Sequence, residues 1–137
     1  MLARAEKRQP PLPPEEIPQS RNVDVLVLHD DEPLRQFLDL HLRHAGYQVR
    51  LAGDSIGASE LVFEAAPDVM VLDIDMPGVH CFEFLAQIRA EKSIPYFPVV
   101  YLTADVAAAA VAFQLGAGCV HKPIQPSKLL ATLAQTA

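Results

Sequence analysis

The sequence predicts a doubly wound α/β fold, in which a mostly parallel β-sheet carries helices on both faces. From residue 23 onward, short apolar runs alternate with stretches of helical periodicity. Five apolar runs are each followed by one helical stretch, which is the order of repeated βαβ units. The runs are apolar at consecutive positions, as in Val25-Leu26-Val27-Leu28. That pattern is typical of strands covered on both faces, so we expect a three-layer arrangement.

The five predicted strands are short and rich in β-branched residues, and polar residues gather at their carboxyl ends. Their predicted extents are Val23–His29, Tyr47–Ala52, Val69–Asp73, Phe97–Leu102 and Cys119–His121.

The helices between and after these strands are predicted from apolar spacing and from start and stop signals. Gly46 is expected to end the first helix and Gly116 the fourth, because glycine favours helix C-termini. Either Asp54 or Ser55 can cap the second, which Pro67 ends. The predicted extents are 34–45, 55–66, 82–89, 104–115 and 127–135.

Composition narrows the class of protein. A chain of 137 residues, half of them apolar, suffices for one domain with a core. The longest apolar stretch, Val106–Phe113, is too short to span a bilayer, and the start lacks a secretory signal. The net charge of −6 argues against a nucleic-acid surface. Cys81 and Cys119 match neither a disulfide framework nor a zinc site, so we expect a reducing, cytoplasmic location.

Residues 1–22 differ from the rest of the chain. They hold five of the twelve prolines and few large apolar residues. We interpret them as a Pro-rich flexible tail, with a solvated or polyproline-like conformation, and residues 23–137 as the folded domain.

Polar side chains stand where the predicted strands end. Asp30 and Asp31 follow the first strand, Asp73 ends the third, Thr103 follows the fourth, and Lys122 follows the fifth. In a sheet of order 2-1-3-4-5 these positions meet around one shallow pocket. Crowded carboxylates raise each other's pKa unless a cation joins them, and Mg²⁺ prefers carboxylate and water oxygens. A hydroxyl and an ammonium beside such an ion suit a phosphoryl group.

Four motifs in this order resemble the receiver domain of two-component response regulators. The resemblance covers about residues 23–136 and implies a flavodoxin-like (βα)5 fold. The motifs are Val27-Leu28-His29-Asp30-Asp31-Glu32-Pro33, the stretch from Pro67 through Asp73-Ile74-Asp75-Met76-Pro77-Gly78, Leu102-Thr103-Ala104, and Lys122-Pro123.

The resemblance implies roles for individual residues. Asp73 corresponds to the phosphoacceptor, which takes a phosphoryl group from a histidine kinase or a histidine phosphotransfer protein. Asp31 corresponds to the direct Mg²⁺ ligand, Asp30 to the acid that holds the metal through water, and the backbone carbonyl of Asp75 to a further ligand. The metal and a lysine neutralise the charge that moves during transfer.

Thr103 corresponds to the hydroxyl that moves toward the phosphoryl group, and Lys122 to its ion-pairing lysine. The implied protein is no enzyme beyond dephosphorylating itself. We expect output through protein contacts, no direct binding of nucleic acid or membrane, and a monomer or weak dimer. The sequence names neither the kinase nor the output partner, and fits a stand-alone receiver or part of a longer regulator.

The sequence departs from the family's pattern in three places that bear on switching, and His29 is a further difference. Val79-His80-Cys81 stands where an apolar residue and Asp-Gly are usual, and Cys119 where an aromatic residue is usual. Asp75 adds an acid two residues after the phosphoacceptor. His29 replaces an apolar residue, and we interpret it as a packing histidine. These changes bear on switching more than on chemistry.

Two other functions stay open. Asp73-Ile74-Asp75 also reads as the Asp-x-Asp motif of haloacid-dehalogenase-like phosphatases, in which the second acid is a general acid. Pro77 departs from that motif, and the chain leaves little room for a cap domain. The third interpretation is a pseudo-receiver, which recognises a partner without being phosphorylated. An intact acid cluster that binds Mg²⁺ would argue against it.

Overall fold

The computed structural model describes residues 23–77, 80–114 and 117–136. The predicted Pro-rich tail lies outside these residues. Within them, five parallel strands form one sheet of order β2-β1-β3-β4-β5, which confirms the predicted fold and strand order. The strands are β1 (Asp24–Leu28), β2 (Gln48–Ala52), β3 (Val69–Asp73), β4 (Val99–Thr103) and β5 (Gly118–His121). The helices are α1 (Glu32–His44), α2 (Ser55–Glu64), α3 (Cys81–Ala90), α4 (Val106–Gln114) and α5 (Pro126–Thr136).

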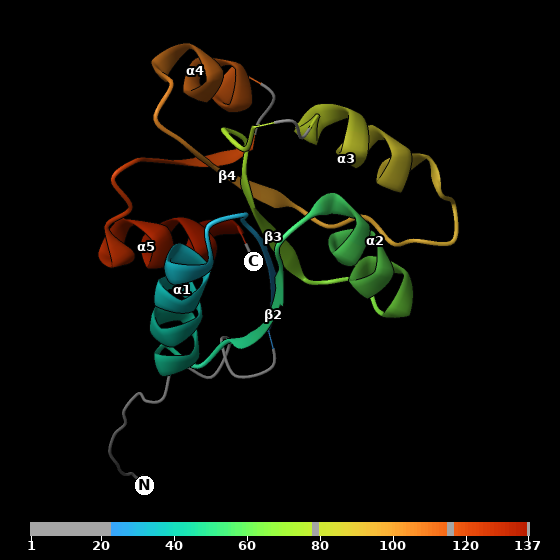
Figure 1. The fold of residues 1–137 in the computed structure, drawn as a ribbon, viewed down its shortest axis with the longest axis horizontal. Helices are drawn as coiled ribbons and strands as arrows, with labels where there is room; N and C mark the ends of the chain where they lie inside the picture. Colours follow the sequence, from blue (N-terminus) through green and yellow to red (C-terminus); the bar gives the residue numbers. More distant parts are fainter. Residues whose placement is uncertain (1–22, 78–79, 115–116, 137) are drawn as a thin grey trace, which may run out of the picture.

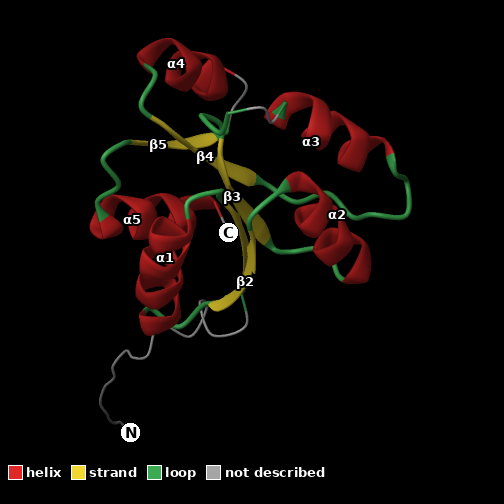
Figure 2. Cartoon of the chain, in the orientation of Figure 1, coloured by secondary structure: helices red, strands yellow, loops and turns green. Residues whose placement is uncertain are grey.

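The sheet separates two layers of helices (Figures 1 and 2). Successive strand side chains point to opposite faces, so Val25 and Val27 join one apolar cluster and Leu26 and Leu28 the other. The first cluster includes buried residues of α1 and α5, and the second includes buried residues of α2, α3 and α4. Both faces of β1 and β3 are therefore covered, which explains their unbroken apolar runs.

The helix ends follow local hydrogen bonding. The Asp54 carboxylate caps α2 by accepting from the Gly57 N–H at 2.7 Å, so Asp54 rather than Ser55 is the cap. α4 begins two residues later than predicted, because the Asp105 carboxylate accepts from the Ala107 N–H at 2.9 Å. Gly46 follows α1 with φ of 101°, a conformation that favours glycine. Gly116, the predicted stop of α4, lies outside the described residues.

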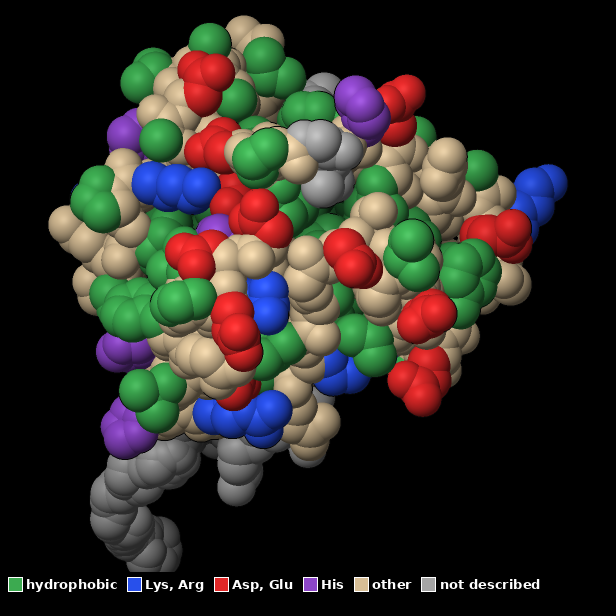
Figure 3. Space-filling model, viewed as in Figure 1, with side chains coloured by type: hydrophobic (Ala, Val, Ile, Leu, Met, Phe, Trp, Pro, Cys, Tyr) green, Lys and Arg blue, Asp and Glu red, His purple; other side chains and the backbone are tan. Residues whose placement is uncertain are grey.

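The strand register brings the predicted site residues to one edge of the sheet. Leu28 of β1 pairs with Leu72, so the residues after β1 lie beside Asp73 at the end of β3. Thr103 at the end of β4 pairs with His121, directly before Lys122. Acidic side chains gather near the middle of the face shown in Figure 3.

In the part of the chain that the structure describes, the helices are too short or too polar to cross a bilayer.

Candidate functional site

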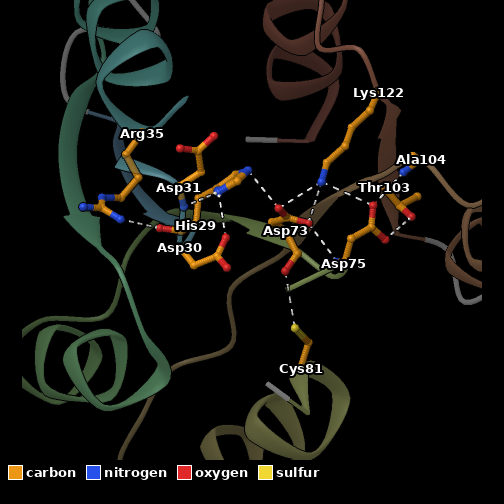
Figure 4. A network of polar contacts seen from close by, with 10 residues as sticks. All are labelled: His29, Asp30, Asp31, Arg35, Asp73, Asp75, Cys81, Thr103, Ala104 and Lys122. Carbon is orange, nitrogen blue, oxygen red and sulfur yellow. Dashed lines mark hydrogen bonds and ion pairs between the residues drawn. The ribbon is translucent and has the colours of Figure 1, made fainter. Parts of the chain in front are cut away.

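Asp73 occupies the centre of the site and is 2% exposed. Both of its carboxylate oxygens lie 3.0 Å from Lys122 Nζ, which donates to them. Oδ1 also accepts the Asp75 N–H at 2.8 Å, and Oδ2 lies 2.8 Å from His29 Nε2. Figure 4 shows this carboxylate between residues from the β1 end and residues from the β4 and β5 ends.

The surroundings of Asp73 keep its carboxylate ionised. Burial opposes the charged form, but the contact with His29, the Asp75 N–H and the Lys122 ammonium outweigh it and lower the pKa. An ionised oxygen held beside a fixed ammonium is suited to attack an electrophilic phosphorus.

Thr103 and Lys122 lie on one side of Asp73, and the Asp75 side chain joins them. The fully buried Thr103 hydroxyl donates to Asp75 Oδ1 at 2.7 Å, and the Ala104 N–H donates to Oδ2 at 2.8 Å. Lys122 Nζ lies 3.3 Å from the same Oδ2. One carboxylate of the chain therefore engages a hydroxyl, a backbone N–H and an ammonium together.

The charges on this side reinforce one another. Burial opposes the charge of Asp75, but donation from Thr103, Ala104 and Lys122 outweighs it and lowers the pKa of Asp75. Burial opposes the charge of Lys122 as well, but Asp73 and Asp75 outweigh it and raise the pKa of Lys122. All three groups stay charged at neutral pH, and the ammonium is shared by two carboxylates.

The other side of Asp73 is built by the end of β1. His29 is 3% exposed, and its Nδ1 accepts the Asp31 N–H at 3.1 Å. Its Nε2 has no hydrogen-bond partner among the described residues, because the ring N–H is not aimed at the nearby Asp73 oxygen. Asp30 Oδ1 lies 3.5 Å from Nδ1. The ring thus stands between two carboxylates, although the sequence suggested only a packing residue.

Asp31 is exposed and stands at the N-cap position of α1, where its side chain makes no capping hydrogen bond. Among the described residues, the group placed to share one metal ion consists of His29, Asp30 and Asp73, which each offer one ligand atom within 4.8 Å of the others. The Asp31 carboxylate is outside that group, and its predicted role as a metal ligand stays a prediction.

Cys81 lies beneath the site at the start of α3. Its thiol donates to the backbone carbonyl oxygen of Asp73, with 3.4 Å between sulfur and oxygen (Figure 4). Burial raises the pKa of this thiol to about 11, and the charges of Asp73 and Asp75 act in the same direction. The thiol is therefore protonated at neutral pH and serves as a hydrogen-bond donor.

The structure brings Asp73, Thr103, Lys122 and the Asp75 side chain into one network and sets Asp30 beside it. Sequence reasoning missed His29 as a member of the site. The available signal was its phase, because Val25, Val27 and His29 point to the same face of the sheet as Val69, Val71 and Asp73.

The sequence matches the response regulator receiver domain family over residues 25–134. The chain belongs to this family. It is 33% identical over 110 residues to the DNA-binding response regulator MtrA of Mycolicibacterium smegmatis, covering 78% of this chain and 47% of that protein. It is 30% identical over 112 residues to the transcriptional regulatory protein GltR of Pseudomonas aeruginosa, covering 80% of this chain and 46% of that protein. This receiver chain thus spans about half the length of the curated relatives it matches.

Solved structures agree with this assignment. The structure of the chemotaxis response regulator CheY4 of Vibrio cholerae superposes on this chain with a TM-score of 0.74 and is 30% identical to it in sequence. The superposition covers 84% of this receiver chain and 98% of that chain. A response regulator structure from Chloroflexus aurantiacus has the same TM-score of 0.74 at 27% identity, with 84% of this chain and 97% of that chain covered.

Proposed function

We propose that this receiver domain accepts one phosphoryl group on Asp73 from a histidine kinase or a histidine phosphotransfer protein, in a Mg²⁺-dependent reaction. The observation that carries the proposal is the buried, ionised Asp73 carboxylate, which Lys122 contacts through both oxygens at 3.0 Å. In the reaction a carboxylate oxygen attacks phosphorus, the bond to the donor's imidazole nitrogen breaks, and the imidazole keeps that electron pair and takes up a proton.

The donor set fits a hard divalent cation. Asp30 and Asp73 offer carboxylate oxygens close together, and Asp31 stands next to them with no capping contact. Asp30, Asp31, Asp73 and the Asp75 backbone carbonyl would hold Mg²⁺, which when bound neutralises the charge that gathers on the phosphoryl oxygens.

The remaining residues act through charge and hydrogen bonding. Lys122 keeps Asp73 ionised and offers its ammonium to the incoming phosphoryl group. The Thr103 hydroxyl and the Ala104 N–H are donors at the same edge, and a phosphoryl group must take them over from Asp75. Output through protein contacts in the cytoplasm, and a monomer or weak dimer, complete the proposal.

The Asp-x-Asp phosphatase is less well supported. That mechanism needs Asp75 as a general acid, yet both Asp75 oxygens accept hydrogen bonds and its pKa is lowered. A carboxylate held in this way has no proton to give at neutral pH. Domains of this family are phosphoacceptors rather than ordinary enzymes, and repeated turnover of a small phosphate ester would overturn our proposal.

Intact-mass spectrometry with acetyl phosphate tests the proposal. With Mg²⁺ the chain is expected to gain one phosphoryl group, and Asp73→Asn to gain none. Glu60→Gln, at an exposed position on α2, is the matched carboxylate control and is expected to behave like the unmodified chain. An Asp73→Asn protein that is labelled at the same rate would refute the assignment, and labelling unchanged by chelation of Mg²⁺ would refute the metal requirement.

A further inference from the structure

His29 carries a buried nitrogen that the proposed function leaves unused. Its ring is 3% exposed, and Nε2 has no hydrogen-bond partner among the residues that the structure describes. Buried polar atoms in folded proteins nearly always have a partner, because an unpaired one loses its hydrogen bonds to water without replacement. A residue that served packing alone would not place this atom 2.8 Å from a carboxylate oxygen. The orphaned nitrogen therefore points to a partner from outside the chain.

The surroundings of Nε2 identify that partner as a cation. His29, Asp30 and Asp73 each offer one ligand atom, and these atoms lie within 4.8 Å of one another. Two ligands about 2.1 Å from one ion are about 3 Å apart when they subtend a right angle. The 2.8 Å between Nε2 and Asp73 Oδ2 suits such a pair. Lys122 lies on the opposite side of Asp73, and on the His29 side the Arg35 guanidinium donates to the His29 backbone carbonyl oxygen. Asp30, Asp31 and Asp73 outnumber that one cation, so the His29 side has a surplus of negative charge.

The nitrogen changes which cation the site prefers. Mg²⁺ is a hard ion that favours oxygen ligands and gives up its waters reluctantly. Imidazole suits first-row transition metals such as Co²⁺, Ni²⁺ and Zn²⁺, whose affinities for nitrogen ligands exceed that of Mg²⁺. A site with one imidazole and two carboxylates resembles the mixed nitrogen and oxygen sites of those ions more than an all-oxygen site.

We propose that His29 is a metal ligand through Nε2, and that the site prefers a divalent transition metal over Mg²⁺. The inference rests on the proposed function, since the same ion would lie beside the phosphoacceptor Asp73. For Nε2 to bind, its proton moves to Nδ1. There one oxygen of the Asp30 carboxylate, now 3.5 Å away, would accept the proton, in place of the bond that Nδ1 now accepts from the Asp31 N–H, and the other Asp30 oxygen would face the metal.

Isothermal titration calorimetry of the full chain with Mg²⁺, Mn²⁺ and Co²⁺, each alone, measures how strongly the site prefers one ion over another. His29→Val is expected to weaken Co²⁺ binding by about tenfold or more and to change Mg²⁺ binding by less than about threefold. His44→Ala removes an exposed histidine of α1 and is expected to leave all three affinities unchanged. If the ratio of Co²⁺ to Mg²⁺ affinity is the same with and without His29, the proposal is wrong.

Pulsed electron paramagnetic resonance of the Mn²⁺-loaded chain gives a direct readout that needs no variant. Modulation from a coordinated imidazole nitrogen is expected, and its absence would overturn the proposal even if His29→Val did not fold. Its loss in His29→Val and retention in His44→Ala would identify the residue. Acetyl phosphate labelling with Mg²⁺ is measured separately. If labelling occurs without any nitrogen signal, phosphorylation of Asp73 stands and the His29 ligand falls.

Discussion

The polar groups on the two sides of Asp73 differ in how many hydrogen-bond partners the chain gives them. On the β4 and β5 side, the Thr103 hydroxyl, the Ala104 N–H and the Lys122 ammonium all contact the Asp75 carboxylate. On the β1 side, a buried nitrogen of His29 has no hydrogen-bond partner among the described residues, and Asp31 makes no capping bond.

This difference determines what a ligand must do to bind on each side of Asp73. A ligand on the β1 side adds partners to groups that lack them. A phosphoryl group on the other side must displace a carboxylate that already carries negative charge and accepts two hydrogen bonds. The Asp75 carboxylate therefore occupies the hydrogen-bond donors that phosphoryl oxygens would use, and a phosphoryl group would compete with it for them.

The largest expected effect is on the two cysteines, which sample the charge of the site unequally. Burial raises the pKa of Cys81 to about 11, with Asp73 and Asp75 acting in the same sense. Burial and the charge of Asp75 raise the pKa of Cys119 as well, but this thiol is only partly buried. At pH 8 about one Cys81 thiol in a thousand is ionised. Iodoacetamide is expected to modify the more exposed Cys119 more than about tenfold faster, as measured by peptide mass spectrometry.

Two variants measure how much each carboxylate, Asp73 or Asp75, contributes to the raised pKa of Cys81. Asp73→Asn and Asp75→Asn should each speed modification of Cys81, because each removes one negative charge that raises the pKa of its thiol. Equal rates for both cysteines in the folded chain would show that Cys81 is neither buried nor under this field. Complete modification of both in denaturant is the control for labelling.

The competition at Asp75 predicts the next largest effect. Asp75→Ala frees Thr103, Ala104 and Lys122 for a phosphoryl group, and a hydrogen bond to a charged group contributes about 1.5–3 kcal/mol. Beryllofluoride with Mg²⁺, monitored by NMR at the Ala104 amide, is expected to bind about tenfold more tightly to the variant.

Asp75→Asn keeps a neutral acceptor for the Thr103 hydroxyl and should give an intermediate affinity, whereas Glu60→Ala on α2 should have no effect. Unchanged or weaker binding to Asp75→Ala would mean that the Asp75 side chain assists the phosphoryl group instead of competing with it.

A smaller effect is expected on the folding stability of the chain at acidic pH. The folded state lowers the pKa of Asp73, since His29, the Asp75 N–H and Lys122 outweigh its burial. Ionised Asp73 therefore adds stability above the unfolded pKa of about 4, and that stability is lost as the pH falls through the lowered folded pKa. Urea unfolding from pH 6 to pH 2 should show a shallower acid decline for Asp73→Asn. An identical decline in both proteins would contradict the shift.

The sequence predicted the parts of the molecule that depend on local patterns. Strand positions follow from apolar runs, and the meeting of Asp73, Thr103 and Lys122 follows from strand order, because parallel strands end at one edge. The Asp75 contacts were not predicted. They depend on a side-chain rotamer that reaches from the end of β3 to the end of β4, and spacing along the chain does not encode this.

His29 illustrates the same limit. Its burial follows from the strand pattern, but whether its ring faces Asp73 or only packs depends on the tertiary neighbours of β1. The start of α4 was placed too early because the alanine-rich stretch gave no boundary, while the Asp105 cap decides it.

The smallest expected effect concerns the strand that carries Cys119. The resemblance to the family implies an aromatic ring at this position, which would move inward on phosphorylation. Cys119 stands there instead and pairs in register with Tyr101 of β4. The Tyr101 ring is buried and lies 5.6 Å from that of Phe82 on α3, so it is already packed. A small thiol neither fills nor vacates the volume of a ring, so β5 has little to rearrange.

Amide hydrogen exchange with and without beryllofluoride and Mg²⁺ is therefore expected to change protection at 103–107 and to leave 118–121 nearly unchanged. The contrast follows from the contacts, since Thr103 and Ala104 would have to release Asp75 for the proposed phosphoryl analogue to bind, whereas Cys119 has no bulky side chain to turn. Cys119→Tyr restores a ring and should make 118–121 respond. The proposed role of this residue would be wrong if both segments of the unmodified chain changed protection equally. It would also be wrong if protection of β5 in Cys119→Tyr did not change on binding.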